Sequence, residues 1–170
     1  MRVGVGALFL KFISFAGVVA VPLIAGAAPA AADEVIVRVE HLRALDKIDL
    51  PTAGQADFYA QVTINGRTVK SKFIRRADEI RPDWVMVVPV RHRHGPARVK
   101  LEILDHNVLT KPTLVDVNRL PDKRDLDFEV DTRRCTVTGF AQTYKCGDPI
   151  KRAGDERRRA QITFTVDVRR

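Results

Sequence analysis

Apolar and polar residues alternate with a period of two along most of the chain after residue 33. This spacing places successive side chains on opposite faces of a β-strand, and no stretch shows the 3.6-residue period of an amphipathic helix. The pattern therefore predicts about eight short strands. They span residues 35–40, 58–64, 67–74, 84–90, 98–104, 126–130, 135–140 and 160–168.

The segments between these strands favour antiparallel connections. Asn65-Gly66 separates two alternating runs, which predicts a hairpin because both residues of such a turn take positive φ. Pro89 indicates an edge position or a strand end for 84–90. The pattern predicts an all-β fold, an antiparallel sandwich of two sheets around one core, with a small barrel as the alternative.

The first 32 residues differ in character from the rest. Arg2 and Lys11 are the charged residues, the run 12–28 is apolar or small, and Ala30 and Ala32 form a small-x-small site. These features predict a signal peptide cleaved after Ala32, which exports a domain of residues 33–170 to the periplasm or the medium. A membrane anchor is the alternative, but the run is Ala-rich and shorter than the roughly 20 strongly apolar residues that spanning needs.

Charge and cysteine content are consistent with export. The chain carries 29 basic and 21 acidic residues; without Arg2 and Lys11 the balance is 27 − 21, or +6. Outside the cell, such a charge favours anionic lipid or polysaccharide over nucleic acid. Cys135 and Cys146 are expected to pair as a disulfide, since two cysteines without a nearby histidine match no zinc pattern.

No catalytic motif is present in the sequence. GxSxG, HExxH and glycine-rich phosphate loops are all missing, so we expect a non-enzymatic protein, although a site without a known motif stays open.

Two long connections, 41–56 and 105–125, are rich in carboxylate and amide side chains. Loops of one sandwich end lie together, and calcium takes six to eight oxygen ligands, so these loops are a candidate calcium site. The alternative is that the same residues only cap turns. The candidate ligands are Asp46, Asp49, Asp57, Asp105, Asn107 and Asp116.

Four segments in order resemble a known family. VIVRVEHLRALD (35–46), ADFYAQVTING (56–66), RPDW (81–84) and VKLEILDHN (99–107) are similar to pieces of the C2 domain, a β-sandwich that binds calcium and phospholipid. The resemblance covers about residues 35–107. The remainder, 106–170, looks more like a bacterial secreted variant of that sandwich.

The resemblance implies which residues would hold calcium. Asp46 and Asp57, with Asp49 as an alternate, match one calcium loop, and Asp105, Asn107 and Asp116 match the other. Asn107 replaces a charged ligand and Asp116 is displaced along the chain, so the resemblance implies a weak site.

A basic cluster between two predicted strands is a second candidate surface. It comprises Arg91, His92, Arg93 and His94, and the resemblance suggests anionic lipid head groups as its target. A solvated surface is the alternative. Lys151-Arg152 adds further positive charge, whereas Phe140 is interpreted as a packing residue.

Together these features predict a non-enzymatic exported binding module, with weak calcium binding at one sandwich end. Its partner would be anionic lipid or another exported protein. The alternative is a metal-independent structural domain, or one that binds a protein or a glycan.

Overall fold

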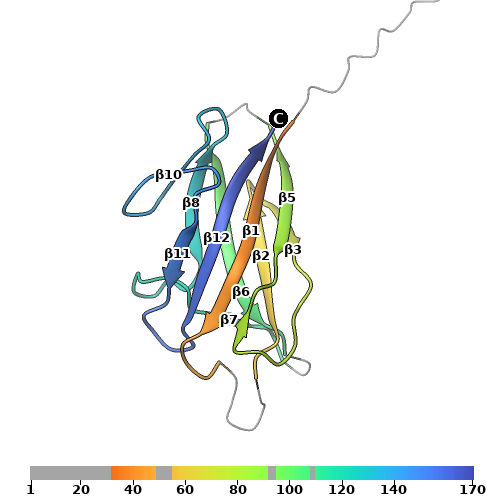
Figure 1. The fold of residues 1–170 in the computed structure, drawn as a ribbon, viewed down its shortest axis with the longest axis vertical. Coiled ribbons are helices and arrows are strands. Elements are labelled where there is room, and N and C mark those ends of the chain that lie inside the picture. Colours follow the sequence, from red (N-terminus) through yellow and green to blue (C-terminus); the bar gives the residue numbers. More distant parts are fainter. Residues whose placement is uncertain (1–31, 49–54, 92–94, 108–109) are drawn as a thin grey trace, which may run out of the picture. The chain divides into compact units, whose positions relative to one another are not determined.

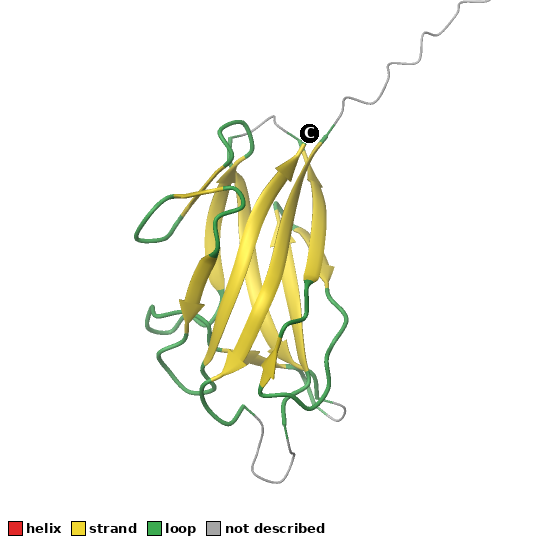
Figure 2. Cartoon of the chain, in the orientation of Figure 1, coloured by secondary structure: helices red, strands yellow, loops and turns green. Residues whose placement is uncertain are grey.

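The computed structural model describes residues 32–48, 55–91, 95–107 and 110–170. Within them the chain forms strands and loops without helices (Figure 2). No helix in these ranges is therefore long and apolar enough to cross a membrane. The predicted signal peptide lies outside the described residues, apart from Ala32.

Twelve strands form two antiparallel sheets that pack face to face (Figure 1). They are β1 (Asp33–Ala44), β2 (Phe58–Ile64), β3 (Arg67–Lys70), β4 (Glu79–Ile80), β5 (Trp84–Val90), β6 (Ala97–Asp105), β7 (Thr113–Val115), β8 (Leu126–Asp131), β9 (Thr136–Thr138), β10 (Tyr144–Lys145), β11 (Ile150–Ala153) and β12 (Ala160–Arg169). The predicted antiparallel sandwich is confirmed, and the sheets do not close into a barrel.

The first sheet has the order β11-β12-β1-β4, and β5 pairs with the same side of β1 as β4 does. The second sheet has the order β10-β9-β8-β6-β2-β3, and β7 continues alongside β6 where β8 stops. β10 and β11 are thus end strands of their sheets, and we call the side of the sandwich that they border the open edge.

All eight predicted strands are present, and four more lie in segments expected to be loops. These four, β4, β7, β10 and β11, have only two to four residues each. A period of two cannot be recognised over so few residues, because such strands are defined by a partner across the sheet. The long connection 105–125 is therefore partly structured.

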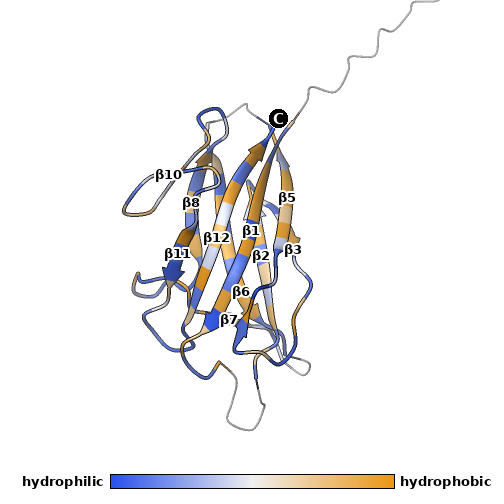
Figure 3. Cartoon of the chain, in the orientation of Figure 1, coloured by the Kyte–Doolittle hydropathy of each residue, from blue (hydrophilic) through white to orange (hydrophobic). Residues whose placement is uncertain are grey.

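Alternating side chains build the core, as the bands along each strand in Figure 3 show. Val35, Val37 and Val39 of β1 are fully buried. The register with β12 then shifts between Val39 and His41, a bulge that turns the even-numbered Leu42 into the core. The bulge keeps the apolar side chains of β1 on the core face before and after it.

The Asn65-Gly66 hairpin is confirmed. φ is 48° at Asn65 and 83° at Gly66, so both residues occupy the left-handed region that a two-residue turn requires. The turn sets β2 against β3 in register, from Ile64 opposite Arg67 to Gln61 opposite Lys70.

Cys135 and Cys146 form a disulfide that closes the β9–β10 hairpin. The hairpin lies at the end of its sheet, where β9 alone pairs with β10. The Cys146 amide also donates to the Cys135 carbonyl, at 3.0 Å. The disulfide thus fixes both ends of a segment that has few other backbone restraints.

We predict that the double variant Cys135→Ser/Cys146→Ser unfolds more readily than the native protein. A disulfide across a sequence separation of 11 restricts the unfolded chain and contributes about 2–3 kcal/mol to the free energy of unfolding. Urea titration measures the change. Reductant should weaken the native protein to a similar extent and leave the variant unaffected; equal stability of both oxidised proteins would contradict the prediction.

Candidate functional site

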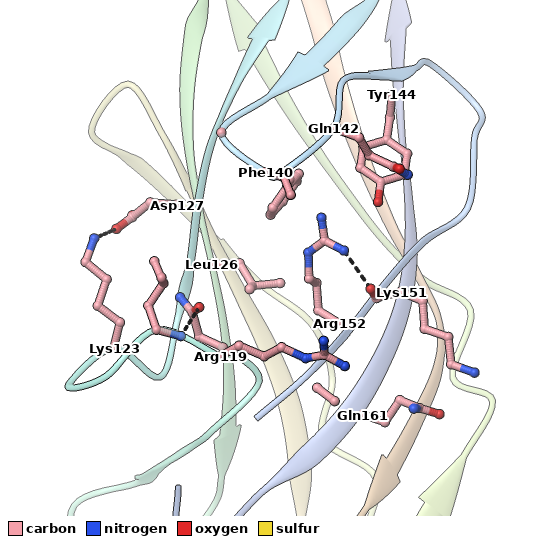
Figure 4. A pocket seen from close by; sticks show the side chains of 15 residues that line it. Arg119, Lys123, Leu126, Asp127, Phe140, Gln142, Tyr144, Lys151, Arg152 and Gln161 are labelled. Carbon is pink, nitrogen blue, oxygen red and sulfur yellow. Dashed lines mark hydrogen bonds and ion pairs between the residues drawn. The ribbon is translucent and has the colours of Figure 1, made fainter. Parts of the chain in front are cut away.

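A pocket of about 570 Å³ lies at the open edge, between the β8–β10 region of one sheet and β11–β12 of the other (Figure 4). This volume falls within the range of small-ligand sites. We call it the open-edge pocket. Its lining includes Arg119, Lys123, Phe140, Tyr144, Arg152 and Gln161.

Phe140 forms the aromatic wall of the pocket and joins it to the core. Its ring lies 5.4 Å from that of Phe128 in β8 and 6.4 Å from that of Phe164 in β12, centroid to centroid. Gly139 makes this approach possible. Its φ is 105°, and a Cβ added there would lie 2.9 Å from the Phe128 Cα, so a side chain would force the loop away.

Arg152 occupies the centre of the open-edge pocket. Its guanidinium carbon lies 4.2 Å from the centroid of Phe140 and 5.5 Å from that of Tyr144. Cation–π attraction at such distances favours a fixed position of the side chain. One terminal nitrogen donates to the Lys151 carbonyl at 2.8 Å, and Arg152 makes no other side-chain hydrogen bond to the described part of the chain.

The other charged side chains around Arg152 differ in direction and in whether they form an ion pair. Arg119 reaches across the pocket toward the β11 side, whereas the Lys151 side chain extends away from it (Figure 4). Lys123 is bound to Asp127, with 3.1 Å between Nζ and Oδ2. Within the described residues this is the one ion pair of the lining, so Arg119 and Arg152 give the pocket a net positive charge.

Asp46, a predicted calcium ligand, is bound by an arginine. Its Oδ1 accepts from Nη2 of Arg159 at 2.7 Å, and its Oδ2 accepts from Nε at 3.0 Å and from the Arg159 backbone N–H at 3.2 Å. The side-chain hydrogen bonds from Arg159 hold the pKa of Asp46 below its ordinary value of 3.8. The positive charge beside Asp46 in this structure is therefore that of Arg159.

Asp116 is fully buried and binds the chain before β12. Its Oδ2 accepts from the backbone N–H groups of Asp155 and Glu156, at 3.0 and 2.7 Å, and its Oδ1 accepts from that of Asn118. Gly154 allows the close approach, since a Cβ there would lie 2.3 Å from the Asp116 carbonyl oxygen. Asp116 therefore acts as a turn anchor.

The remaining predicted ligands lie at the junction of β2 and β6. Asp105 Oδ1 accepts from the Asp57 backbone N–H at 2.8 Å, and Asp57 Oδ1 accepts from the Arg76 backbone N–H at 2.9 Å. Asn107 donates to the Thr113 hydroxyl at 3.1 Å. Asp49 lies outside the described residues.

The structure therefore brings Asp57 and Asp105 together but holds Asp46 and Asp116 on the segment 154–159. Among the described residues, no three His, Cys, Asp or Glu side chains are grouped so as to hold a metal ion. Calcium binding by these residues stays a prediction. Their observed partners match the alternative that they cap and anchor turns.

The predicted basic cluster is described only at its first residue. Arg91 follows β5 and is exposed, whereas His92, Arg93 and His94 lie outside the described residues. Their role in binding anions stays a prediction.

Comparisons with known proteins establish the fold. No family model matches the sequence, and a search of curated proteins finds no match. Solved structures, however, match over most of the chain. It has the fold of a C2 domain.

Three of these structures illustrate the likeness. The tandem C2 domains of extended-synaptotagmin 2 match with a TM-score of 0.55 and 12% identity, over 92% of this chain and 48% of that one. A single C2 domain of plant extended synaptotagmin 1 matches with 0.54 and 12%, over 83% and 97%. Human GIVD cytosolic phospholipase A2 matches with 0.53 and 13%, over 84% of this chain but only 17% of its own length.

Sequence reasoning missed the open-edge pocket. The sequence pattern identifies Lys151-Arg152 only as positive charge and Phe140 only as a packing residue. The contact between Phe140 and Arg152 crosses from one sheet to the other, and Arg119 joins from a third segment. The one available signal was the Lys151-Arg152 pair in a segment expected to be a loop, and exposed basic residues are too common to single out a site.

We predict that Asp46→Asn lowers stability at neutral pH and that the deficit disappears in acid. The pKa of Asp46 is lowered in the folded state, so its contribution is present above the ordinary value of 3.8 and is lost as pH falls through the lower, folded value. Urea unfolding at pH 7, 5 and 3 measures this. The exposed Asp83→Asn provides a matched control. A deficit of the same size at pH 3 as at pH 7 would contradict the prediction.

Proposed function

We propose that this chain is an exported, non-catalytic binding module that holds an anionic ligand in the open-edge pocket and needs no calcium to do so. The observation that carries the proposal is the position of Arg152, held against Phe140 and Tyr144 inside a pocket where neither it nor Arg119 has an ion-pair partner among the described residues.

Charge complementarity supports an anionic ligand. The single carboxylate of the lining, Asp127, is bound by Lys123, so nothing acidic in the described lining opposes the two arginines. A guanidinium partly shielded from water by aromatic rings interacts more strongly with an anion than one on an open surface. The pocket therefore offers both a positive charge and a cavity that excludes part of the solvent.

The chemistry of the lining supports a binding role rather than catalysis. Among the described residues that form it there is no His, Cys or Ser, and the one Asp is engaged. The other groups of the lining that could transfer a proton are Tyr144, Lys123 and Lys151, of which Lys123 is bound to Asp127 and Lys151 extends away from the pocket (Figure 4).

Export is supported by the sequence of residues 1–32 and agrees with the Cys135–Cys146 disulfide, which is typical of oxidising compartments. Anionic lipid is a second source of the same negative charge, favoured by the C2 fold and by the basic residues 91–94. The two sources are compared experimentally below.

We predict that calcium leaves the melting temperature of the protein unchanged. An ion that binds the folded state at a hundred times its Kd would add about 2.7 kcal/mol, which shifts the midpoint by several degrees. Melting with millimolar calcium and with EDTA tests this. Magnesium controls for ionic strength, and a rise specific to calcium would contradict this expectation and support the predicted site at Asp57 and Asp105.

We predict that small polyanions bind and that Arg152→Gln weakens their binding about tenfold or more, because a charge-assisted hydrogen bond is lost. Calorimetric titration with tripolyphosphate and with a trimer of galacturonic acid measures the effect. Lys72→Gln is the control, since Lys72 is exposed and follows β3, which lies at the other end of its sheet from β10. Absence of binding by both probes, or equal binding by Arg152→Gln, would refute the proposal.

A further inference from the structure

The two cations that face into the open-edge pocket are both arginines. A guanidinium presents a planar set of N–H donors that matches the two oxygens of a carboxylate, whereas a lysine is a point charge. The two lysines of the lining do not compete for this role. Lys123 is bound to Asp127, and Lys151 extends away from the pocket.

The plane of Arg152 is fixed before a ligand arrives. Phe140 and Tyr144 lie on it at 4.2 and 5.5 Å, and the Lys151 carbonyl accepts one of its N–H groups. Phe140 is itself held by Phe128 and Phe164. A donor set fixed in this way loses little side-chain freedom on binding, which favours selection by geometry as well as by charge.

Hydroxyl-binding groups and an apolar wall accompany the arginines. Gln142 and Gln161 line the pocket, and within the described residues neither makes a side-chain hydrogen bond to the protein. The Gln142 side chain lies beside Tyr144, whereas the Gln161 amide extends outward, as Lys151 does (Figure 4). An amide both donates and accepts, which suits hydroxyl groups. Leu126 is buried at the base, and Ala153 and Phe140 add apolar surface, which suits the C–H face of a sugar ring.

We infer that the open-edge pocket binds a carboxylated sugar, such as a uronic acid residue of an acidic polysaccharide. Arg152 and Arg119 hold the carboxylate, the Gln142 amide holds a ring hydroxyl, and the apolar wall contacts the ring. This inference rests on the proposed function and names the ligand class of the same site.

A membrane surface fits the same region less well. Four large apolar side chains are exposed in the described parts of the chain: Leu45, Phe73, Val85 and Leu120. Only Leu120 lines the pocket, and the other three lie after β1, after β3 and within β5. A single apolar residue provides little insertion into a bilayer, whereas a recessed pocket admits one ring of a soluble polymer.

The test compares four probes on the full-length protein by calorimetric titration. The probes are a galacturonic acid trimer, its fully methyl-esterified form, tripolyphosphate and phosphatidylglycerol vesicles. The ester keeps the ring and removes the charge, so we expect it to bind about tenfold or more weakly than the acid. Tripolyphosphate and the vesicles should also bind more weakly than the acid trimer.

Two variants of Arg152 separate the geometry of its donors from its charge, and two further variants serve as a second test and a control. Arg152→Lys keeps the charge but loses the planar donors, so we expect it to weaken the acid trimer nearly as much as Arg152→Gln does. Arg119→Gln, in an exposed connection, tests the site independently of β11. Lys72→Gln should bind as the native protein does, and melting temperatures check that every variant is folded.

The outcomes distinguish this inference from the proposed function. Binding of tripolyphosphate or vesicles that depends on Arg152, without binding of the galacturonic acid trimer, would overturn the sugar-acid inference and leave an anion-binding pocket. Full restoration of trimer binding by Arg152→Lys, or equal binding of acid and ester, would also overturn it. Absence of binding by all four probes would refute both.

Discussion

The contact between Phe128, Phe140 and Phe164 is the interaction on which the open edge of the sandwich depends. Phe128 comes from one sheet, Phe164 from the other, and Phe140 from the loop that joins β9 to β10. Because Phe140 contacts both partners, it ties the end hairpin to the core. The same ring carries Arg152 on its outer side, so the charge in the pocket is placed by core packing.

Two loop carboxylates fix one connection of the sandwich through hydrogen bonds to other protein groups. Asp46 is bound by Arg159, and Asp116 accepts three backbone N–H groups. Both fix the segment before β12, which pairs with β1 at the centre of its sheet. A buried carboxylate with satisfied oxygens is stable without a metal, because hydrogen bonds replace its lost hydration.

A shared fold leaves function to be argued from the site. One solved C2 structure with a similar fold, of extended-synaptotagmin 2, is described as calcium bound. In this chain the carboxylates at the β2–β6 junction and those that bind the 154–159 segment have protein partners. The open edge carries a pocket whose two arginines have no ion-pair partner among the described residues.

The sequence alone determined the all-β class, the positions of the eight main strands along the chain, the Asn65-Gly66 turn and the pairing of Cys135 with Cys146. Each of these depends on neighbours in the chain: alternation over several residues, a turn dipeptide, or a count of cysteines. The tertiary structure decided the bulge that turns Leu42 inward, the four short strands, the partners of Asp46 and Asp116, and the meeting of Arg119, Phe140 and Arg152. These depend on contacts between distant segments, and a single chain's local pattern does not encode which distant residue a charged side chain will meet.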